Sequence, residues 1–278
     1  MTGRIAHLSD IHFGAETHAA VEGVIDWLRS FAPDVTVVTG DLTLNGKPPE
    51  FGAAAEWLAR LPAPRVVTPG NHDTPYLNLV LRALTPFDRF RRYIGPDTRS
   101  SANAAGLVVR ALNSARGAQR RLDWSKGALS IADLRATEWG PESSESGRTE
   151  DVRVFACHHP LMELPGAPVT GGVTCGREAA LVLDEADVEL VLTGHVHRSF
   201  AAPLSGEPGR YAIGAGTLSK RTRGEPPSFS TIVVGDEAFE VTQHAWRGEG
   251  FVTEHQWLLP RRGALGDLLP TQTTPAAE

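Results

Sequence analysis

Five short blocks of the sequence bring carboxylates, an amide and imidazoles into spacings that suit metal binding. The blocks read Asp10-x-His12, Gly40-Asp41, Gly70-Asn71-His72-Asp73, His158-His159-Pro160 and Gly194-His195-x-His197. Alternate residues of an extended segment point to the same side, so each pair spaced by one residue can aim two donors at one centre. Oxygen and imidazole donors without a thiolate suit divalent ions such as Mn, Fe, Co, Ni or Zn. The donors are too many for one ion, so we expect two ions that share a ligand.

Two such ions would suit phosphoryl chemistry. A pair about 3.5 to 4 Å apart lowers the pKa of a bridging water and can clamp the oxygens of an in-line displacement. Each block alone also has an ordinary structural explanation. An Asp after a strand can cap a helix, Gly-Asn-His-Asp can form a turn, and His-x-His can be a surface pair. Because all five blocks occur in order at strand ends, we favour the metal site.

The elements that must position these blocks follow from hydrophobic periodicity. We expect strands at 5–9, 35–39, 65–68, 107–113, 152–157 and 188–193, and helices at 19–31, 50–61, 77–93, 130–139 and 177–187. Pro86 must start, kink or divide the helical segment 77–93. The C-terminal tips of parallel strands in an open α/β sheet lie on one edge, where ligands bind. Five of these tips carry the blocks.

The later sequence follows a different pattern. Strand-like segments at 200–204, 211–215, 229–235, 239–246 and 251–259 are separated by turns that contain Gly or Pro, which predicts a second, antiparallel sheet. We expect exposed connections before Gly127 and at 141–151. Segment 251–259 can serve as the edge of a homodimer or have a role inside the fold. We expect one domain over 1–260 and a disordered tail over 261–278.

Taken together, the five blocks resemble the signature of the calcineurin-like metallophosphoesterase superfamily, over residues 5 to 197. The resemblance implies an α/β fold arranged as a four-layer α-β-β-α sandwich with two mixed sheets. A dinuclear metal site would lie at the C-terminal tips of the strands.

The resemblance also implies a role for each site residue. The first metal would be held by Asp10, His12, Asp41 and His197, and the second by Asp41, Asn71, His158 and His195. Asp41 would bridge the two ions. His72 would contact the phosphate and assist the leaving oxygen, with Asp73 orienting its imidazole. The family pattern His-x-Pro selects His158 over His159, which would lie behind the ligands. The roles of Asn45, Asn113, Arg221 and Arg223 stay open between substrate contact and surface.

Departures from the motifs of other superfamily members narrow the range of activities that we expect. Protein Ser/Thr phosphatases of the superfamily carry Asp-Arg-Gly and Asn-His-Glu where this chain reads Gly-Asp-Leu and Asn-His-Asp. The sequence looks like the compact bacterial group of cyclic-nucleotide and glycerophosphodiester phosphodiesterases. We therefore expect hydrolysis of a small organic phosphodiester by a hydroxide that bridges two Mn, Fe, Co or Zn ions. A phosphomonoesterase that uses Arg221 or Arg223 is the first alternative, and a metal-binding sensor or scaffold without turnover is the second.

Composition limits the partners and the compartment. Net charge is −6 and the pI is about 5.9, which disfavours nucleic acid. No apolar run approaches 18 residues and no signal peptide precedes residue 5, so we expect a cytoplasmic protein without a membrane partner. The two cysteines, Cys157 and Cys175, are expected to be reduced thiols. The expected partner is a small phosphoester substrate.

Overall fold

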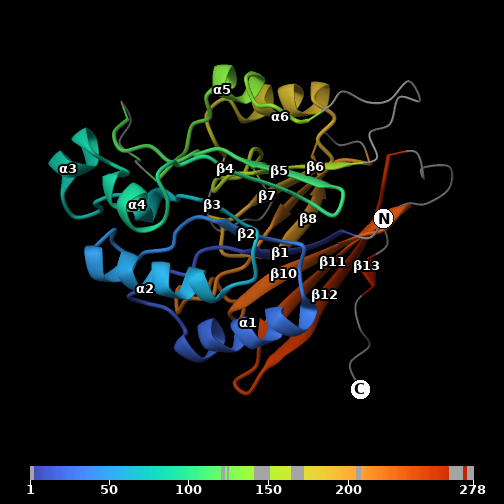
Figure 1. Cartoon of the computed structure of the whole chain (residues 1–278), viewed down its shortest axis with the longest axis horizontal. Helices are drawn as coiled ribbons and strands as arrows, with labels where there is room; N and C mark the ends of the chain where they lie inside the picture. The colour runs from blue at the N-terminus through green and yellow to red at the C-terminus, as the bar shows by residue number, and fades with distance from the viewer. Residues whose placement is uncertain are drawn as a thin grey trace.

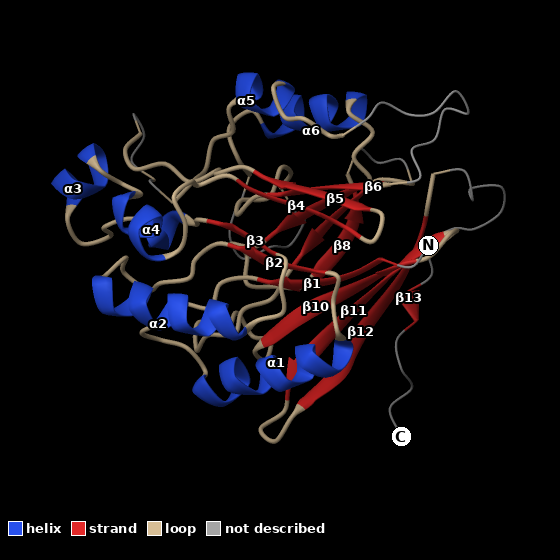
Figure 2. Ribbon diagram, in the orientation of Figure 1, coloured by secondary structure: helices blue, strands red, loops and turns tan. Residues whose placement is uncertain are grey.

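The computed structural model describes residues 3–119, 123, 125–140, 151–163, 172–204, 208–262 and 272–273 of the 278-residue chain. Two mixed sheets face each other, and helices cover their outer faces (Figures 1 and 2). The predicted α/β sandwich is therefore confirmed. None of the helices in the described residues is long and apolar enough to span a membrane.

The first sheet has the strand order β13-β12-β11-β10-β1-β2-β3. Its strands are β1 (Gly3–Leu8), β2 (Val35–Thr39), β3 (Arg65–Thr68), β10 (Ser228–Val234), β11 (Ala238–Trp246), β12 (Phe251–Pro260) and β13 (Gln272–Thr273). Strands β1, β2 and β3 are parallel, whereas β10 pairs antiparallel with β1. Helices α1 (His18–Phe31) and α2 (Pro48–Arg60) cover the outer face of this sheet.

The second sheet has the order β4-β5-β6-β7-β9-β8. Its strands are β4 (Ser100–Ala104), β5 (Leu107–Ala111), β6 (Val152–Ala156), β7 (Leu190–Thr193), β8 (Phe200–Pro203) and β9 (Tyr211–Gly214). Helices α5 (Ile131–Arg135) and α6 (Gly176–Glu185) lie over its outer face (Figure 1). Three short helical segments follow β3 along the chain, namely η1 (Asn71–Asp73), α3 (Leu79–Leu84) and α4 (Asp88–Tyr93).

Strand β2 shows why the sequence selects this architecture. All five of its residues are buried, as expected for a parallel strand that is covered on both faces. Val35 and Val37 point into the core between the sheets, while Val38 points into the core under the helices. Successive side chains of a strand alternate between its faces, so one apolar run joins two cores. A third core lies beneath α5 and α6.

Two expectations about the strands were wrong. The late strands do not form a sheet of their own, because β10, β11 and β12 extend the first sheet from β1, whereas β8 and β9 join the second sheet. The β1–β10 register runs from Gly3↔Val234 to His7↔Ser230, a pairing that local periodicity does not reveal. Strand β4 was also missed, because its sequence SSANA has no large apolar residue.

The remaining expectations were met in part or lie outside the described residues. The helical segment 77–93 is divided, and Pro86 lies between α3 and α4. The connection predicted at 141–151 falls on undescribed residues except for Asp151. Of the predicted tail, the structure describes 261–262 and β13, which pairs with β12 at Trp257 and Gln256. The domain boundary stays a prediction.

Candidate metal centre

The five blocks meet where the tips of the two sheets come together. Strands β1, β2 and β3 contribute blocks from the first sheet, and β6 and β7 contribute blocks from the second. The expected single edge is thus a junction of two sheets. All seven candidate ligands are buried, and none is more than 7% exposed. Buried polar groups are costly unless they are hydrogen-bonded, paired or bound to metal.

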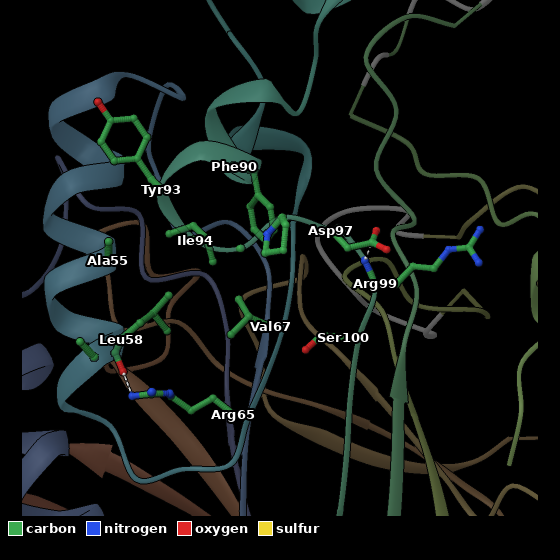
Figure 3. A pocket seen from close by; sticks show the side chains of 13 residues that line it. Ala55, Leu58, Arg65, Val67, Phe90, Tyr93, Ile94, Asp97, Arg99 and Ser100 are labelled. Atoms are coloured by element: carbon green, nitrogen blue, oxygen red, sulfur yellow. Dashed lines mark hydrogen bonds between the residues drawn. The ribbon is translucent and has the colours of Figure 1, made fainter. Parts of the chain in front are cut away.

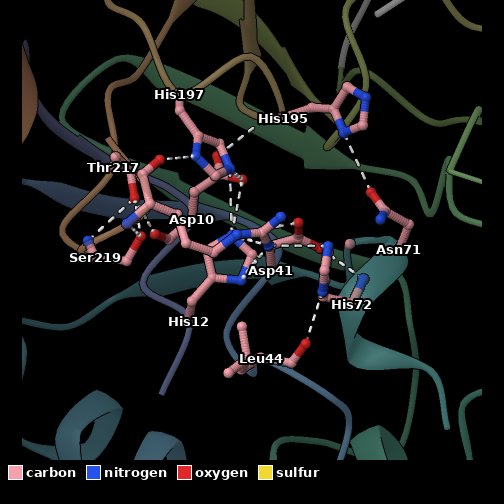
Figure 4. A network of polar contacts seen from close by, with 12 residues as sticks. Asp10, His12, Asp41, Leu44, Asn71, His72, His195, His197, Thr217 and Ser219 are labelled. Carbon is pink, nitrogen blue, oxygen red and sulfur yellow. Dashed lines mark hydrogen bonds and ion pairs between the residues drawn. The ribbon is translucent and has the colours of Figure 1, made fainter. Parts of the chain in front are cut away.

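A first cluster joins Asp10, His12, Asp41 and His197, with ligand atoms that all lie within 4.8 Å of one another (Figure 4). Nε2 of His197 lies 3.1 Å from Oδ1 of Asp10 and 3.2 Å from Nε2 of His12. These four residues are the set that the resemblance implies for the first ion.

A second cluster forms around Asn71. Its Oδ1 lies 3.1 Å from Nδ1 of His195 and 3.2 Å from Nε2 of His158. Oδ2 of Asp41 lies 3.4 Å from Nε2 of His158 and 3.7 Å from Nε2 of His12. The Asp41 carboxylate therefore lies between the two clusters, where a bridging ligand has to lie. The division of the ligands between two ions stays a prediction.

Backbone carbonyls orient three of the imidazoles. Nδ1 of His158 is 2.7 Å from the carbonyl oxygen of Thr39, and Nδ1 of His197 is 2.7 Å from that of Arg221. Nδ1 of His12 makes a longer contact of 3.2 Å with the carbonyl oxygen of Thr43. A carbonyl can only accept, so each Nδ1 donates and each Nε2 faces the cluster. Burial is outweighed by neighbouring carboxylates, which raise the pKa of His158 to about 9 and also raise that of His197, so a bound ion would replace a proton on these two rings. Metal-binding histidines are commonly oriented in this way.

The electrostatics of the clusters suit cations. Burial lowers the pKa values of His12 and His195 to about 3, so both rings are neutral and can donate lone pairs. Burial alone would raise the pKa of Asp41, but the imidazoles of His158 and His72 hold it well below its usual value. Nε2 of His195 is buried without a hydrogen-bond partner among the described residues. The neutral imidazoles of His12 and His195, the ionised carboxylate of Asp41 and this unpaired nitrogen suit divalent ions.

Backbone strain is concentrated at the centre. Nine non-glycine residues of the described chain have positive φ angles, and five of them are candidate ligands. Those five are Asp10 (55°), His12 (49°), Asp41 (51°), His195 (69°) and His197 (57°). Each left-handed residue of this kind costs on the order of 1–3 kcal/mol and persists where the surroundings enforce it. The strain turns the side chains of the strand tips inward.

Gly40 allows Asp41 its close approach. Gly40 has a φ of +82°, and a Cβ there would lie 2.6 Å from the backbone nitrogen of Gly70 and 2.9 Å from Nδ1 of His158. We expect Gly40→Ala to destabilise the protein by at least about 2 kcal/mol, because it adds strain and overlap at a rigid tip. Urea unfolding with the linear extrapolation checks this value.

The matched control is Gly52→Ala in α2. A Cβ there has no neighbour within 4 Å, and alanine is the better helix former by about 1 kcal/mol. Gly52→Ala should leave stability unchanged or raise it. Equal stability of Gly40→Ala and the wild type would contradict the close packing of this tip.

His72 and Asp73 lie beside the clusters, but not in the arrangement that was expected. The carboxylate of Asp73 accepts hydrogen bonds from the backbone nitrogens of Leu42, Thr43 and Gly70. No described contact joins it to the imidazole of His72. Nδ1 of that ring is instead 2.7 Å from the carbonyl oxygen of Leu44. Asp73 thus fixes the loop after β2 against η1, and the orienting contact belongs to Leu44.

Arg221, whose role the sequence left open between substrate contact and surface, reaches the centre. Its Nη1 lies 3.0 Å from Nε2 of His72 and 3.4 Å from Nε2 of His12. Ser219 accepts a hydrogen bond from the backbone nitrogen of Arg221, and Thr217 donates one to the carbonyl oxygen of Asp10. The loop that carries Arg221 is therefore fixed to the first strand tip (Figure 4).

The other residues whose roles the sequence left open were placed as follows. His159 lies close enough to His158 and His195 for a ligand atom of each to fall within 4.8 Å of the others, but both its ring nitrogens have other partners, at 2.8 Å from Oγ of Ser114 and 2.7 Å from the carbonyl oxygen of Ser125. The side chain of Asn113 accepts a hydrogen bond from the backbone of Ala115. No described hydrogen bond or ion pair joins Asn45 or Arg223 to the candidate ligands, although the charge of Arg223 interacts with those of Asp10 and Arg221.

A pocket of about 380 Å³ lies away from this centre, between α2, β3 and the segment that follows α4 (Figure 3). Phe90, Tyr93, Arg65 and Arg99 contribute to its lining, and no candidate ligand does. The chemistry of the donors, rather than the size of a cavity, therefore identifies the candidate metal centre.

Comparison with known families agrees with this geometry. The model of the calcineurin-like phosphoesterase family matches residues 3–199. The chain therefore belongs to the calcineurin-like phosphoesterases, a family that depends on two metal ions.

Among curated proteins, the chain is 26% identical over 211 residues to a Synechococcus protein described as "Probable cyclic nucleotide phosphodiesterase". That match covers 72% of this chain and 75% of the relative. The present chain is also 36% identical over 95 residues to the glycerophosphodiester phosphodiesterase GpdQ of Enterobacter lignolyticus. This match covers 30% of the present chain and 34% of GpdQ. The cyclic adenosine monophosphate phosphodiesterase CpdA of Escherichia coli is 36% identical over 81 residues, which are 25% and 30% of the two chains.

Solved structures share the fold at low sequence identity. A dimetal phosphatase from Danio rerio has a TM-score of 0.54 at 13% identity, and the match covers 90% of this chain and 98% of that one. The purple acid phosphatase PPD1 from yellow lupin has a TM-score of 0.56 at 12% identity, with 100% and 57% covered. These likenesses concern the fold alone.

Proposed function

We propose that the protein hydrolyses a small organic phosphodiester with the help of two divalent metal ions. The position of the Asp41 carboxylate between two clusters of buried imidazoles is the observation that carries this proposal. Asp10, His12, Asp41 and His197 would hold one ion, and Asp41, Asn71, His158 and His195 the other. When bound, two such ions activate water and neutralise charge on the phosphoryl oxygens. Mn, Fe, Co and Zn all suit these ligands.

The chain's own groups complete the site. Arg221 can bind an oxygen of the phosphate, because its guanidinium projects over His12 and His72. Nε2 of His72 accepts from Arg221 in the structure, and burial lowers the pKa of this imidazole. Once Arg221 has turned to the substrate, Nε2 of His72 can take up a proton from solvent and donate it to the leaving oxygen, which returns the ring to its neutral form.

Cyclic nucleotides and glycerophosphodiesters are the substrate classes that we propose. The printed names of the curated relatives supply both classes. The test is a panel of these diesters, bis(p-nitrophenyl) phosphate and p-nitrophenyl phosphate, each with Mn, Fe, Co and Zn. We expect the diesters to be hydrolysed faster than the monoester. A large preference for p-nitrophenyl phosphate would replace the proposal with a phosphomonoesterase.

Arg221 is the observation that favours this second candidate, because a dianionic monoester gains more from an added cation than a diester does. We expect Arg221→Ala to lower kcat/KM by about 10²-fold, the usual effect of removing one donor from a developing oxyanion. Arg221→Lys should recover part of the loss. Steady-state kinetics with both ester types measures the effect.

Arg223→Ala is the control for Arg221, since Arg223 lies in the same loop and is exposed. It should behave like the wild type. If Arg221→Ala reduces monoester and diester hydrolysis no more than Arg223→Ala does, Arg221 has no contact with the phosphate.

We also propose that the protein acts in the cytoplasm. Cys157 and Cys175 are free thiols, the first buried and the second exposed. An exposed free thiol is typical of a reducing compartment.

A further inference from the structure

Helix α3 exposes apolar side chains and buries its charged one, the reverse of an ordinary surface helix. Nine large apolar side chains of the described chain are exposed, and six of them lie between residues 76 and 84. They are Tyr76 (39%), Leu77 (72%), Leu79 (59%), Val80 (67%), Leu81 (38%) and Leu84 (75%). The only charged residue of α3, Arg82, is 3% exposed and donates to the carbonyl oxygen of Gly117. Surface helices normally turn their apolar side to the core and their charges to water.

This apolar segment, residues 76–84, is accompanied by positive charge. Figure 1 shows α3 at the outer margin of the molecule, with α4 next to it. Arg91 and Arg92 of α4 are both exposed. Residues 76–99 contain five arginines and two aspartates, whereas the whole chain has a net charge of −6. Arg82 is buried, and Arg91 and Arg99 each pair with an aspartate, so Arg92 supplies the exposed charge that no described ion pair offsets. The segment is therefore an apolar and basic region of an acidic protein.

The apolar segment 76–84 is also joined to the candidate metal centre. The ring of Tyr76 stacks on the imidazole of His72, with centroids 4.7 Å apart and planes 7° from parallel. The backbone nitrogen of Tyr76 donates to the carbonyl oxygen of Asn45, in the loop that follows β2. Whatever covers the segment will therefore lie beside His72.

We propose that the apolar segment 76–84 docks the protein on the surface of an anionic lipid membrane. A helix that combines exposed apolar side chains with nearby Lys or Arg can lie in the plane of a bilayer, with its apolar side about 5–10 Å deep, as amphipathic interfacial helices do. The expectation of no membrane partner rested on spanning segments and a signal peptide, which do not bear on peripheral contact. Docking would place His72 and the mouth of the centre near lipid headgroups.

Two other occupants fit less well. A single acyl chain would stay half in water, because these side chains are exposed and none of them lines the two pockets that the structure describes. A second copy of the chain would bring the arginines of both α4 helices together, and like charges oppose association. An anionic membrane both covers the apolar side chains and attracts the arginines.

The test is vesicle flotation of the purified protein without substrate. We expect binding to vesicles of phosphatidylglycerol and phosphatidylcholine, weaker binding to phosphatidylcholine alone, and further weakening in high salt. The variant Leu79→Ser/Val80→Ser/Leu84→Ser should lose at least tenfold in binding. Arg91→Gln should lose about fivefold, the usual contribution of one arginine near an anionic surface.

Matched controls come from the same protein. Leu181→Ser/Val252→Ser/Leu258→Ser alters the three exposed apolar side chains that lie elsewhere, on α6 and β12. Arg29→Gln removes an exposed arginine from a pair of the same i,i+3 type as Arg91–Asp88. Both controls should bind vesicles like the wild type. Circular dichroism checks that each variant is folded. If the triple serine variant is not folded, the comparison of Arg91→Gln with Arg29→Gln decides the test.

Absence of vesicle binding by the wild type, or an equal loss in the controls, would overturn the proposal. A wild-type dimer that does not bind vesicles, and that the triple serine variant dissociates, would identify the segment as an interface between two copies. Flotation needs neither metal nor turnover. The proposed phosphodiesterase activity can therefore fail while membrane docking holds, or the reverse.

Discussion

Asp41→Asn is expected to lower kcat/KM for bis(p-nitrophenyl) phosphate by at least about 10³-fold in the Mn-loaded enzyme, or about 4 kcal/mol. An amide is neutral and has a single oxygen, so it can serve one ion, as proposed for Asn71, but it cannot bridge two ions as a carboxylate does. Asparagine keeps an oxygen that can accept from the backbone nitrogen of His72, as Oδ1 of Asp41 does at 2.8 Å. The loss therefore reports metal binding rather than misfolding. Kinetics and metal analysis by mass spectrometry measure it together.

Asp26→Asn is the control for this substitution, because Asp26 lies on α1 with its side chain 82% exposed. It should retain two ions per chain and full turnover. Undiminished turnover in Asp41→Asn would contradict the assignment of a dinuclear site that shares Asp41. Loss of turnover with both ions retained would leave the ligand set in place and remove only the bridging role.

His72→Asn is expected to retain metal and to lower kcat by about 10²- to 10⁴-fold for a diester with an alkoxide leaving group, the usual contribution of general acid catalysis. The asparagine amide can replace Nδ1 as the donor to the Leu44 carbonyl, whereas the Nε2 position is lost. A p-nitrophenolate leaving group needs little protonation. Its departure should therefore be slowed much less than that of glycerol.

The comparison of leaving groups separates two roles of His72. An equal loss with both diesters would mean that the imidazole acts on the phosphate and not on the leaving oxygen. Loss of metal would mean that it supports the ligands. His255→Asn, on the exposed part of β12, is the control and should leave kinetics and metal content unchanged.

The sequence was informative about the centre because each ligand belongs to a local block. The spacing within a block, such as His195-x-His197, can be read from the sequence without knowing which sheet the strand belongs to. The role of Arg221 could not be found in this way. Its position depends on a loop that returns from β9 and is fixed by Thr217 to the backbone of Asp10, a contact between residues 207 positions apart. Only the folded chain brings such groups together.

For the fold, as for the site, local features could be predicted from the sequence, but pairings between distant segments could not. Apolar periodicity revealed β1, β2 and β3 with their helices, because each of these elements has a buried face that the local sequence records. It could not reveal which sheet β10 joins, since β10 has apolar residues suited to either. The edge strand β4 carries no apolar signal because it lies on an exposed margin. The orientation of His72 by Leu44 involves a backbone carbonyl, and no residue type marks such a contact.

The position of β1 between β2 and β10 also affects how the protein can fold during its synthesis. Strand β1 is synthesised long before β10, its partner on one side, which ends at Val234. One edge of β1 must therefore stay unpaired while most of the chain is made, and an unpaired edge invites association with other nascent chains. The last ligand, His197, also emerges late. The candidate metal centre can therefore be completed only after strands of both sheets have been synthesised.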